Sequence, residues 1–206
     1  MSDATQTRVY EEGNYGLKVF PLNSDGTYGT GYAVEGTVNV DITFSRTRTN
    51  TPADDVVDYL NRTSPEKGEG TITLIGLKLS DYQKLYNNII DTNGVIVGGR
   101  TNQSKRLGVI FYNTKNYEEG SSTNMFVLPN VTFELPNLST TTIAEDDTTI
   151  RAFELSVTAN PMNFTYNSGA NKDRYTWAVV NSVDNSTIWN NVKDTVYVPE
   201  STISQL

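Results

Sequence analysis

The 206-residue chain contains neither cysteine nor histidine. Without these residues it cannot build a Cys/His metal centre, a thiol nucleophile or a Ser-His-Asp triad. Its apolar runs fall short of the roughly 18 residues that a membrane-spanning helix needs, and the segment after Met1 lacks the basic and apolar regions of a secretory signal. We therefore expect no catalytic residue, no metal, no cofactor, no membrane partner and no Sec-type export.

Basic residues are scarce as well. Lysine and arginine number 16 against 24 acidic residues, giving a net charge of -8, and the isoelectric point is about 4.6. This balance argues against a patch that binds nucleic-acid backbone, although an acidic surface can still face DNA by repelling it. The mean hydropathy of -0.44 and the many threonines and asparagines favour strands and turns over helices.

Alternating polar and apolar residues predict a mainly β fold in one domain. The clearest case is Val38, Val40, Ile42 and Phe44, which are separated by polar residues, so that one face is buried and the other is wet. Similar patterns, or short apolar runs bounded by turn residues, predict strands at residues 15–20, 28–34, 71–74, 95–97, 107–112, 125–128, 131–135, 153–159 and 175–180. A sandwich or barrel with one flanking helix accommodates them.

The one convincing helix is predicted over residues 81–92. Ser80 and Gln83 form a capping box, and the spacing of Tyr82, Leu85, Tyr86, Ile89 and Ile90 places these side chains on one face. Asn93-Gly94 then supplies a left-handed helix end. The helix is expected to lie flat on the sheet, because it is too short to bury its apolar face alone.

Residues 45–69 form a segment longer than an ordinary hairpin connection. Its apolar centre is Val56, Val57, Tyr59 and Leu60, and its flanks carry Arg46, Arg48 and Arg62. Two interpretations stay open: a solvated flexible loop, or a projection whose centre forms a helical turn or docks on a neighbour. Residues 1–12 and 181–206 are polar or irregularly patterned and are predicted to be terminal arms.

The order of features resembles the major tail tube proteins of long-tailed, non-contractile bacteriophages. The resemblance covers residues 13–180. It rests on Tyr15-Gly16-Leu17-Lys18, the strand at residues 36–44, the long loop, and Gly68-Glu69-Gly70-Thr71-Ile72-Thr73-Leu74 leading to a helix at Asp81. It implies a β-sandwich or barrel with a flanking helix, a projecting loop and terminal arms. It also implies hexameric rings stacked into a tube with an acidic lumen.

The resemblance also implies roles for residues and partners. If the strands line a channel, their polar positions place Asp41, Glu134 and Glu154 in the lumen. The loop would reach the next ring through Arg46, Arg48, Val56, Val57, Tyr59, Leu60 and Arg62, and would be mobile in the free subunit. The partners would be other copies of the chain and the tape measure, tail terminator and baseplate proteins. Genome DNA would pass through the virion tail without specific binding, and the protein would be made in the cytoplasm of the bacterial host.

Two other functions fit the composition. The two tryptophans and 12 tyrosines could serve a sugar-binding β-sandwich module of a baseplate or receptor-binding protein, although aromatic residues more often pack sheets and subunit contacts. An enzyme that uses only carboxylates ranks last, because it needs two acids at a set separation across a cleft. The pairs Asp54-Asp55 and Asp146-Asp147 do not match a calcium loop and are predicted to lie in solvated turns.

Overall fold

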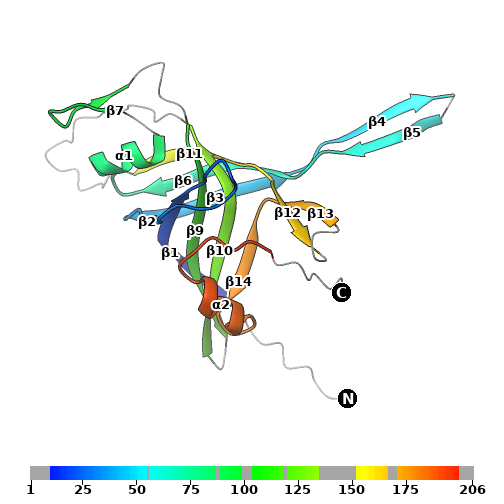
Figure 1. Ribbon diagram of the computed structural model, residues 1–206. Coiled ribbons are helices and arrows are strands. Elements are labelled where there is room, and N and C mark those ends of the chain that lie inside the picture. Colours follow the sequence, from blue (N-terminus) through cyan, green and yellow to red (C-terminus); the bar gives the residue numbers. More distant parts are fainter. Residues whose placement is uncertain are drawn as a thin grey trace, which may run out of the picture.

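The computed structural model describes residues 10–54, 56–86, 89–98, 104–117, 120–134, 152–166 and 171–199. As predicted, the protein is mainly β (Figure 1). One antiparallel sheet has the strand order β2-β1-β9-β10-β11-β6-β3, and β14 also pairs with β10. Its strands are β1 (Tyr10–Pro21), β2 (Tyr32–Ala33), β3 (Thr37–Ser45), β6 (Lys67–Leu74), β9 (Arg106–Tyr117), β10 (Gly120–Phe133), β11 (Phe153–Ala159) and β14 (Ala178–Asn181).

The sheet curves into an open barrel. β1 lies beside β3, yet no backbone ladder joins them in the part of the chain that the structure describes. The enclosed core includes Leu17, Ile72, Phe133 and Val157, which are almost wholly buried. Gly70 of β6 allows the close approach of β3, because a Cβ atom here would lie 1.9 Å from the carbonyl oxygen of Asp41.

The long strand β10 contains a bulge that changes its partner. The sequence predicted two strands separated by Pro129, but the ladder to β9 only shifts register between Leu128 and Val131. Before the bulge β10 pairs with β14, and after it with β11. The carbonyl of Pro129 accepts a hydrogen bond from the Tyr28 hydroxyl at 2.8 Å, which satisfies one backbone group at the bulge.

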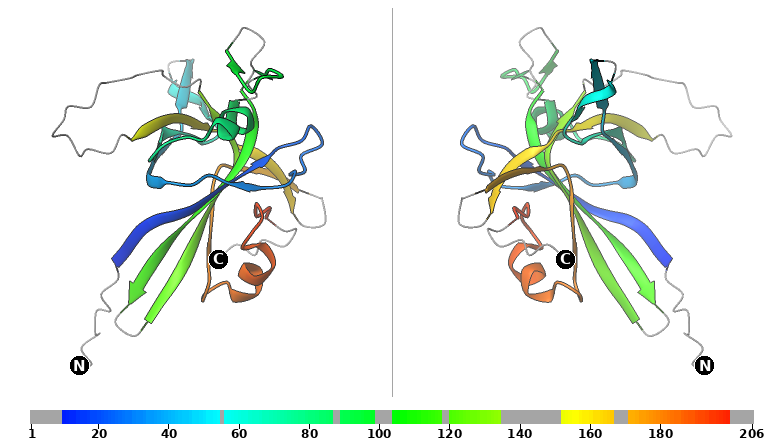
Figure 2. Two further views of the ribbon diagram at one scale, coloured as in Figure 1. Left: turned by 90° about the vertical axis from the view of Figure 1, so that its left-hand side faces the viewer. Right: turned by 90° about the vertical axis from the view of Figure 1, so that its right-hand side faces the viewer.

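A second core lies on the outer face of β9 and β10. It contains Ile110, Met125, Val127 and Val180, and is covered by α2 (Ser186–Val192) and the chain that follows it. Figure 2 shows α2 in orange next to the long green strands. The expectation of an arm at residues 181–206 is therefore wrong as far as residue 199, because apolar residues such as Val196 and Trp189 pack on the sheet. Residues 200–206 lie outside the described chain.

The first helix is shorter than predicted. α1 spans Leu79–Tyr86, and the Asp81 carboxylate, rather than Ser80, accepts a backbone N–H at its start, from Lys78 at 3.0 Å. Leu85 and Tyr86 are buried, and the Tyr86 ring meets Phe133 edge-on at 6.4 Å. The helix thus packs on the sheet core, as expected.

Ile89 and Ile90 do not continue this helix. They form β7 (Ile89–Ile90), which pairs with β8 (Ile96–Val97). The Asp91 carboxylate accepts the N–H groups of Asn93 and Val95, and Gly94 has a φ of +81°. Asn93-Gly94 is therefore part of a hairpin turn and not a helix end, because these local hydrogen bonds favour the turn.

Three other predictions change. Residues 10–12 belong to β1 rather than to an arm, and residues 1–9 lie outside the described chain. Residues 45–69 contain a hairpin of β4 (Arg48–Ala53) and β5 (Val56–Thr63) instead of an irregular loop. The strand predicted at residues 175–180 is β14, preceded by an unforeseen hairpin of β12 (Met162–Tyr166) and β13 (Asn171–Tyr175). Among the described residues, no helix is long and apolar enough to cross a membrane.

Candidate functional site

The outer side of β3, β6 and β11 is an exposed polar surface. Register places Asp41 opposite Thr71 and Thr71 opposite Ser156, so these three side chains lie in one row. The neighbouring rows are formed in the same way. We call this surface the polar face, and it consists of Asn39, Asp41, Thr43, Glu69, Thr71, Thr73, Glu134, Glu154, Ser156 and Thr158.

The structure brings the three predicted acids together on the polar face. Asp41 and Glu154 are exposed on β3 and β11. Glu134 follows β10, and its N–H donates to the Ser156 carbonyl at 2.9 Å, which extends the row of Asp41. Thr37, by contrast, is opposite the buried Leu74 and lies on the core side, because a bulge between Thr37 and Asn39 reverses the alternation.

The polar face contains one further acid, Glu69, which the sequence pattern did not predict. Glu69 lies between Gly68 and Gly70, which interrupt the polar and apolar alternation that marks the rest of β6. Its carboxylate binds Lys67 at 2.7 Å, and this hydrogen bond and charge lower the pKa of Glu69. Asp41, Glu69, Glu134 and Glu154 outnumber the two cations that register places next to them on β6 and β9, Lys67 and Arg106.

Apolar side chains line a hollow between β3 and the strands β9 and β10. Its volume is about 380 Å³, with Val40, Ile42 and Phe44 on one wall and Phe111 and Phe126 on the other. The three β3 side chains are only partly buried. β3 is also the last strand of the sheet order. Among the described residues, this part of the molecule therefore combines a strand edge that has no ladder partner with apolar side chains.

The β4–β5 hairpin extends away from the body of the protein (Figure 1). Tyr59 and Leu60 are 63% and 43% exposed. Because they are consecutive in a strand, they lie on opposite faces of the hairpin. Leu60 is opposite Thr51, and Arg62 is opposite Thr49. Both faces of the hairpin thus offer a large apolar side chain to a neighbour.

The predicted residues of this segment have different surroundings. Arg48 donates to the Asn61 side chain across the hairpin at 2.8 Å, and Arg62 is exposed. Arg46 is not free, because its Nε lies 3.3 Å from the Glu66 carboxylate at the hairpin base. Val56 and Val57 lie in β5, but their side chains are outside the described residues.

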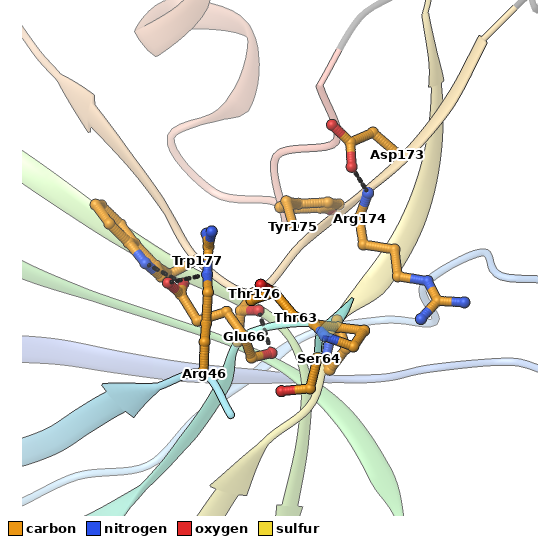
Figure 3. A pocket seen from close by; sticks show the side chains of 11 residues that line it. Arg46, Thr63, Ser64, Glu66, Asp173, Arg174, Tyr175, Thr176 and Trp177 are labelled. Carbon is orange, nitrogen blue, oxygen red and sulfur yellow. Dashed lines mark hydrogen bonds and ion pairs between the residues drawn. The ribbon is translucent and has the colours of Figure 1, made fainter. Parts of the chain in front are cut away.

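A cavity of about 520 Å³ lies where the hairpin joins the body (Figure 3). Its walls come from Arg46 and residues 63–66 on one side, and from Pro161 and residues 173–177 on the other. The Glu66 carboxylate accepts the Trp177 indole N–H at 2.9 Å, and the Glu66 carbonyl accepts the Thr176 hydroxyl at 2.9 Å. Glu66 on one wall of the cavity is therefore hydrogen-bonded to Thr176 and Trp177 on the other.

The described residues include no group of three or more His, Cys, Asp or Glu that could hold a metal ion. No known protein family matches the chain, and no curated protein is significantly similar to it.

Proposed function

We propose that the protein is a structural subunit of a long, non-contractile bacteriophage tail, which polymerises as stacked hexameric rings into a tube that conducts genome DNA. The observation that carries this proposal is the polar face. There, Asp41, Glu134 and Glu154 share one exposed surface, on the opposite side of the sheet from the apolar core. A channel for DNA requires a wall that is wet, acidic and backed by a rigid sheet, because a basic wall would retain the DNA.

Ring formation is supported by β3. Its outer edge has no ladder partner among the described residues, and the partly buried Val40, Ile42 and Phe44 lie beside it. Within the described chain β1 lies beside β3 without a ladder, and an edge whose backbone groups have no ladder partner can pair with another strand. Pairing between subunits would extend the polar face around a ring and cover the apolar hollow.

Ring stacking is supported by the β4–β5 hairpin. Tyr59 and Leu60 expose apolar area far from the subunit's own core. Burial against the next ring would contribute about 25 cal/mol per Å² of apolar area, and repetition around a ring adds avidity. Arg48 and Arg62 would meet acidic neighbours and favour register more than affinity. Tape measure, terminator and baseplate proteins would bind inside the tube and at its two ends.

The absence of cysteine allows a direct test of the lumen. Concentrated protein is expected to form tubes in negative-stain micrographs. In tubes of Ser156→Cys, a small maleimide should react whereas a maleimide on a large polymer should not, because the polymer cannot enter the channel. Asp184→Cys, exposed beside α2, is the control and should react with both. A Ser156→Cys tube that reacts with the large reagent would overturn the lumen assignment, and protection from both reagents would indicate a subunit interface.

A phage assay tests the charge of the wall. Replacing Asp41, Glu134 and Glu154 with lysine should leave tubes intact but hinder genome ejection. The matched control replaces Glu12, Glu35 and Asp184 with lysine. These residues are exposed outside the polar face, and their replacement changes the net charge by the same amount. Normal ejection from the first variant would count against the proposal.

A sugar-binding module remains a second candidate because of one observation. The Trp177 ring is 48% exposed beside the cavity that also contains Asp173 and Arg174. Aromatic rings next to planar polar groups suit sugars. Protein that stays monomeric at high concentration and binds a glycan array through Trp177 would favour this candidate.

A further inference from the structure

The direction of the β4–β5 hairpin is determined at its base. Within the described chain, β4 and β5 pair only with each other. The ladder of β3 and β6 ends at Ser45 opposite Lys67, and the hairpin ladder starts at Arg48 opposite Thr63. Residues 46–47 on one leg thus face residues 64–66 on the other. One leg therefore has one more residue than the other, as at a β-bulge, and an extra residue of this kind redirects a strand.

Two hydrogen bonds join the two legs within this connection. The Ser64 N–H donates to the Thr47 carbonyl, and the Thr47 N–H donates to the Ser64 hydroxyl, both at 2.8 Å. The legs therefore move as one unit. A change in direction requires movement between this unit and the body of the protein.

Glu66 connects that unit to the body. One carboxylate oxygen lies 3.3 Å from Arg46 Nε on the opposite leg, and the other accepts the Trp177 N–H at 2.9 Å (Figure 3). Its backbone carbonyl accepts the Thr176 hydroxyl. The Trp177 ring lies 5.9 Å from that of Phe44, and so is itself held against β3. The Glu66 side chain is 24% exposed, which limits competition from water.

We propose that Glu66 is a positioning residue that holds the hairpin in one direction before assembly. The cavity of about 520 Å³ beside the joint leaves space into which the hairpin can tilt when the contacts of Glu66 are removed. A hairpin that already points in the binding direction loses less conformational freedom when it meets a neighbour. The consequence for assembly rests on the proposed tail tube function, but the effect on direction does not.

Distance measurements between two spin labels test the effect on direction. Thr51→Cys on the hairpin and Asp184→Cys beside α2 are both exposed, and the natural chain has no cysteine to interfere. In the free subunit, Glu66→Ala should broaden the distance distribution roughly twofold, because the hydrogen bond from Trp177 to a charged acceptor and the ion pair with Arg46 are both lost. Glu35→Ala is the control: it removes an acid from an exposed ion pair with Lys78, and should leave the width unchanged.

Two milder variants keep the proposal testable if Glu66→Ala fails to fold. Trp177→Phe retains the ring but removes the N–H, and Arg46→Ala removes the other partner; each should broaden the distribution by less than Glu66→Ala. If folded Glu66 and Trp177 variants keep the wild-type width, the proposal is wrong.

Assembly is measured separately from direction. The protein concentration at which Glu66→Ala forms tubes should rise by about tenfold. If the wild-type protein forms no tubes at any concentration, the tail tube function fails, whereas the label distances still decide the role of Glu66. If the distances broaden and assembly is unchanged, Glu66 positions the hairpin but the hairpin does not drive stacking.

Discussion

Strands β9 and β10 are buried on both faces, whereas β3, β6 and β11 are buried on one. Ile110 and Val127 lie under α2 on the outer face of the first pair. On the outer face of β3, β6 and β11, the side chains of Asp41 and Ser156 are exposed to solvent. One sheet therefore carries a structural outer surface and a candidate functional one. What separates them is the segment of residues 182–199, which covers only the first.

The largest effect on stability should follow from a substitution that creates a cavity under α2. Ile110 is fully buried, so Ile110→Ala should lower the free energy of unfolding by about 2–5 kcal/mol. Ser156→Ala on the polar face should change it by less than about 0.5 kcal/mol. Urea unfolding measures both. Equal effects would remove the distinction between the two outer faces.

The covering segment itself should contribute a smaller amount. The Trp189 ring is partly buried and meets the Tyr112 ring edge-on at 6.0 Å. Trp189→Ala should lower the free energy of unfolding by about 1–3 kcal/mol. Ile188→Ala, a more exposed neighbour on the same helix, serves as control and should have little effect. An unchanged urea midpoint for Trp189→Ala would show that α2 is dispensable to the fold.

Alkaline pH should weaken the covered region. Burial, assisted by the charge of Asp194, raises the pKa of Tyr112 to about 12, and burial raises that of Tyr28 to about 12, from an ordinary 10.0. A raised tyrosine pKa means that the unfolded chain loses its proton first. The contribution to stability is therefore complete below pH 10.0 and is lost as the pH rises towards about 12.

Phenylalanine substitution provides the measurement. Urea midpoints between about pH 9 and 11 should fall more gradually for Tyr28→Phe than for the wild type. Each hydroxyl also donates to a backbone carbonyl, that of Tyr28 to Pro129 and that of Tyr112 to Lys193, so both substitutions should in addition lower the midpoint at neutral pH. Parallel pH profiles for all three proteins would contradict the assignment.

The smallest effect on stability should come from the hairpin, although its effect on assembly should be complete. Replacing residues 51–61 with an Asn-Gly turn removes strands that pair only with each other within the described chain. The free energy of unfolding should stay within about 1 kcal/mol of the wild-type value, while tubes no longer form. Replacing Tyr59 and Leu60 with serine should have the same outcome. Unfolding of the shortened protein would place the hairpin in the core, and normal tubes would exclude it from the ring contact.

Strands with regular alternation were predictable from the sequence. The pattern of Val40, Ile42 and Phe44 identified β3, and residues 153–159 correspond to β11. Val38, predicted on the same buried face, is instead 50% exposed, next to the bulge between Thr37 and Asn39. Both strand predictions are confirmed because one-sided burial leaves a period-2 pattern that needs no distant partner to be recognised. The same pattern placed Asp41 and Glu154 on the wet side of their strands.

Other elements depended on contacts that no local pattern shows. Ile89 and Ile90 fit a helical face as well as a strand, and the pairing with β8 decides between them. Pro129 is typical of a strand end, yet a bulge retains it within β10. Trp189 and Val196 are irregularly spaced, because they cover the sheet from a short helix and the irregular chain after it.

The sequence by itself determined the mainly β class and, except at the start of β3, the wet side of the alternating strands, because both follow from local spacing of polar and apolar residues. It also excluded chemistry that needs cysteine or histidine. Only the tertiary structure placed Glu69 and Glu134 beside Asp41 and Glu154, and Glu66 beside Trp177. These groups meet through strand register and through contacts between residues 111 positions apart, and such distances in sequence leave no local signal.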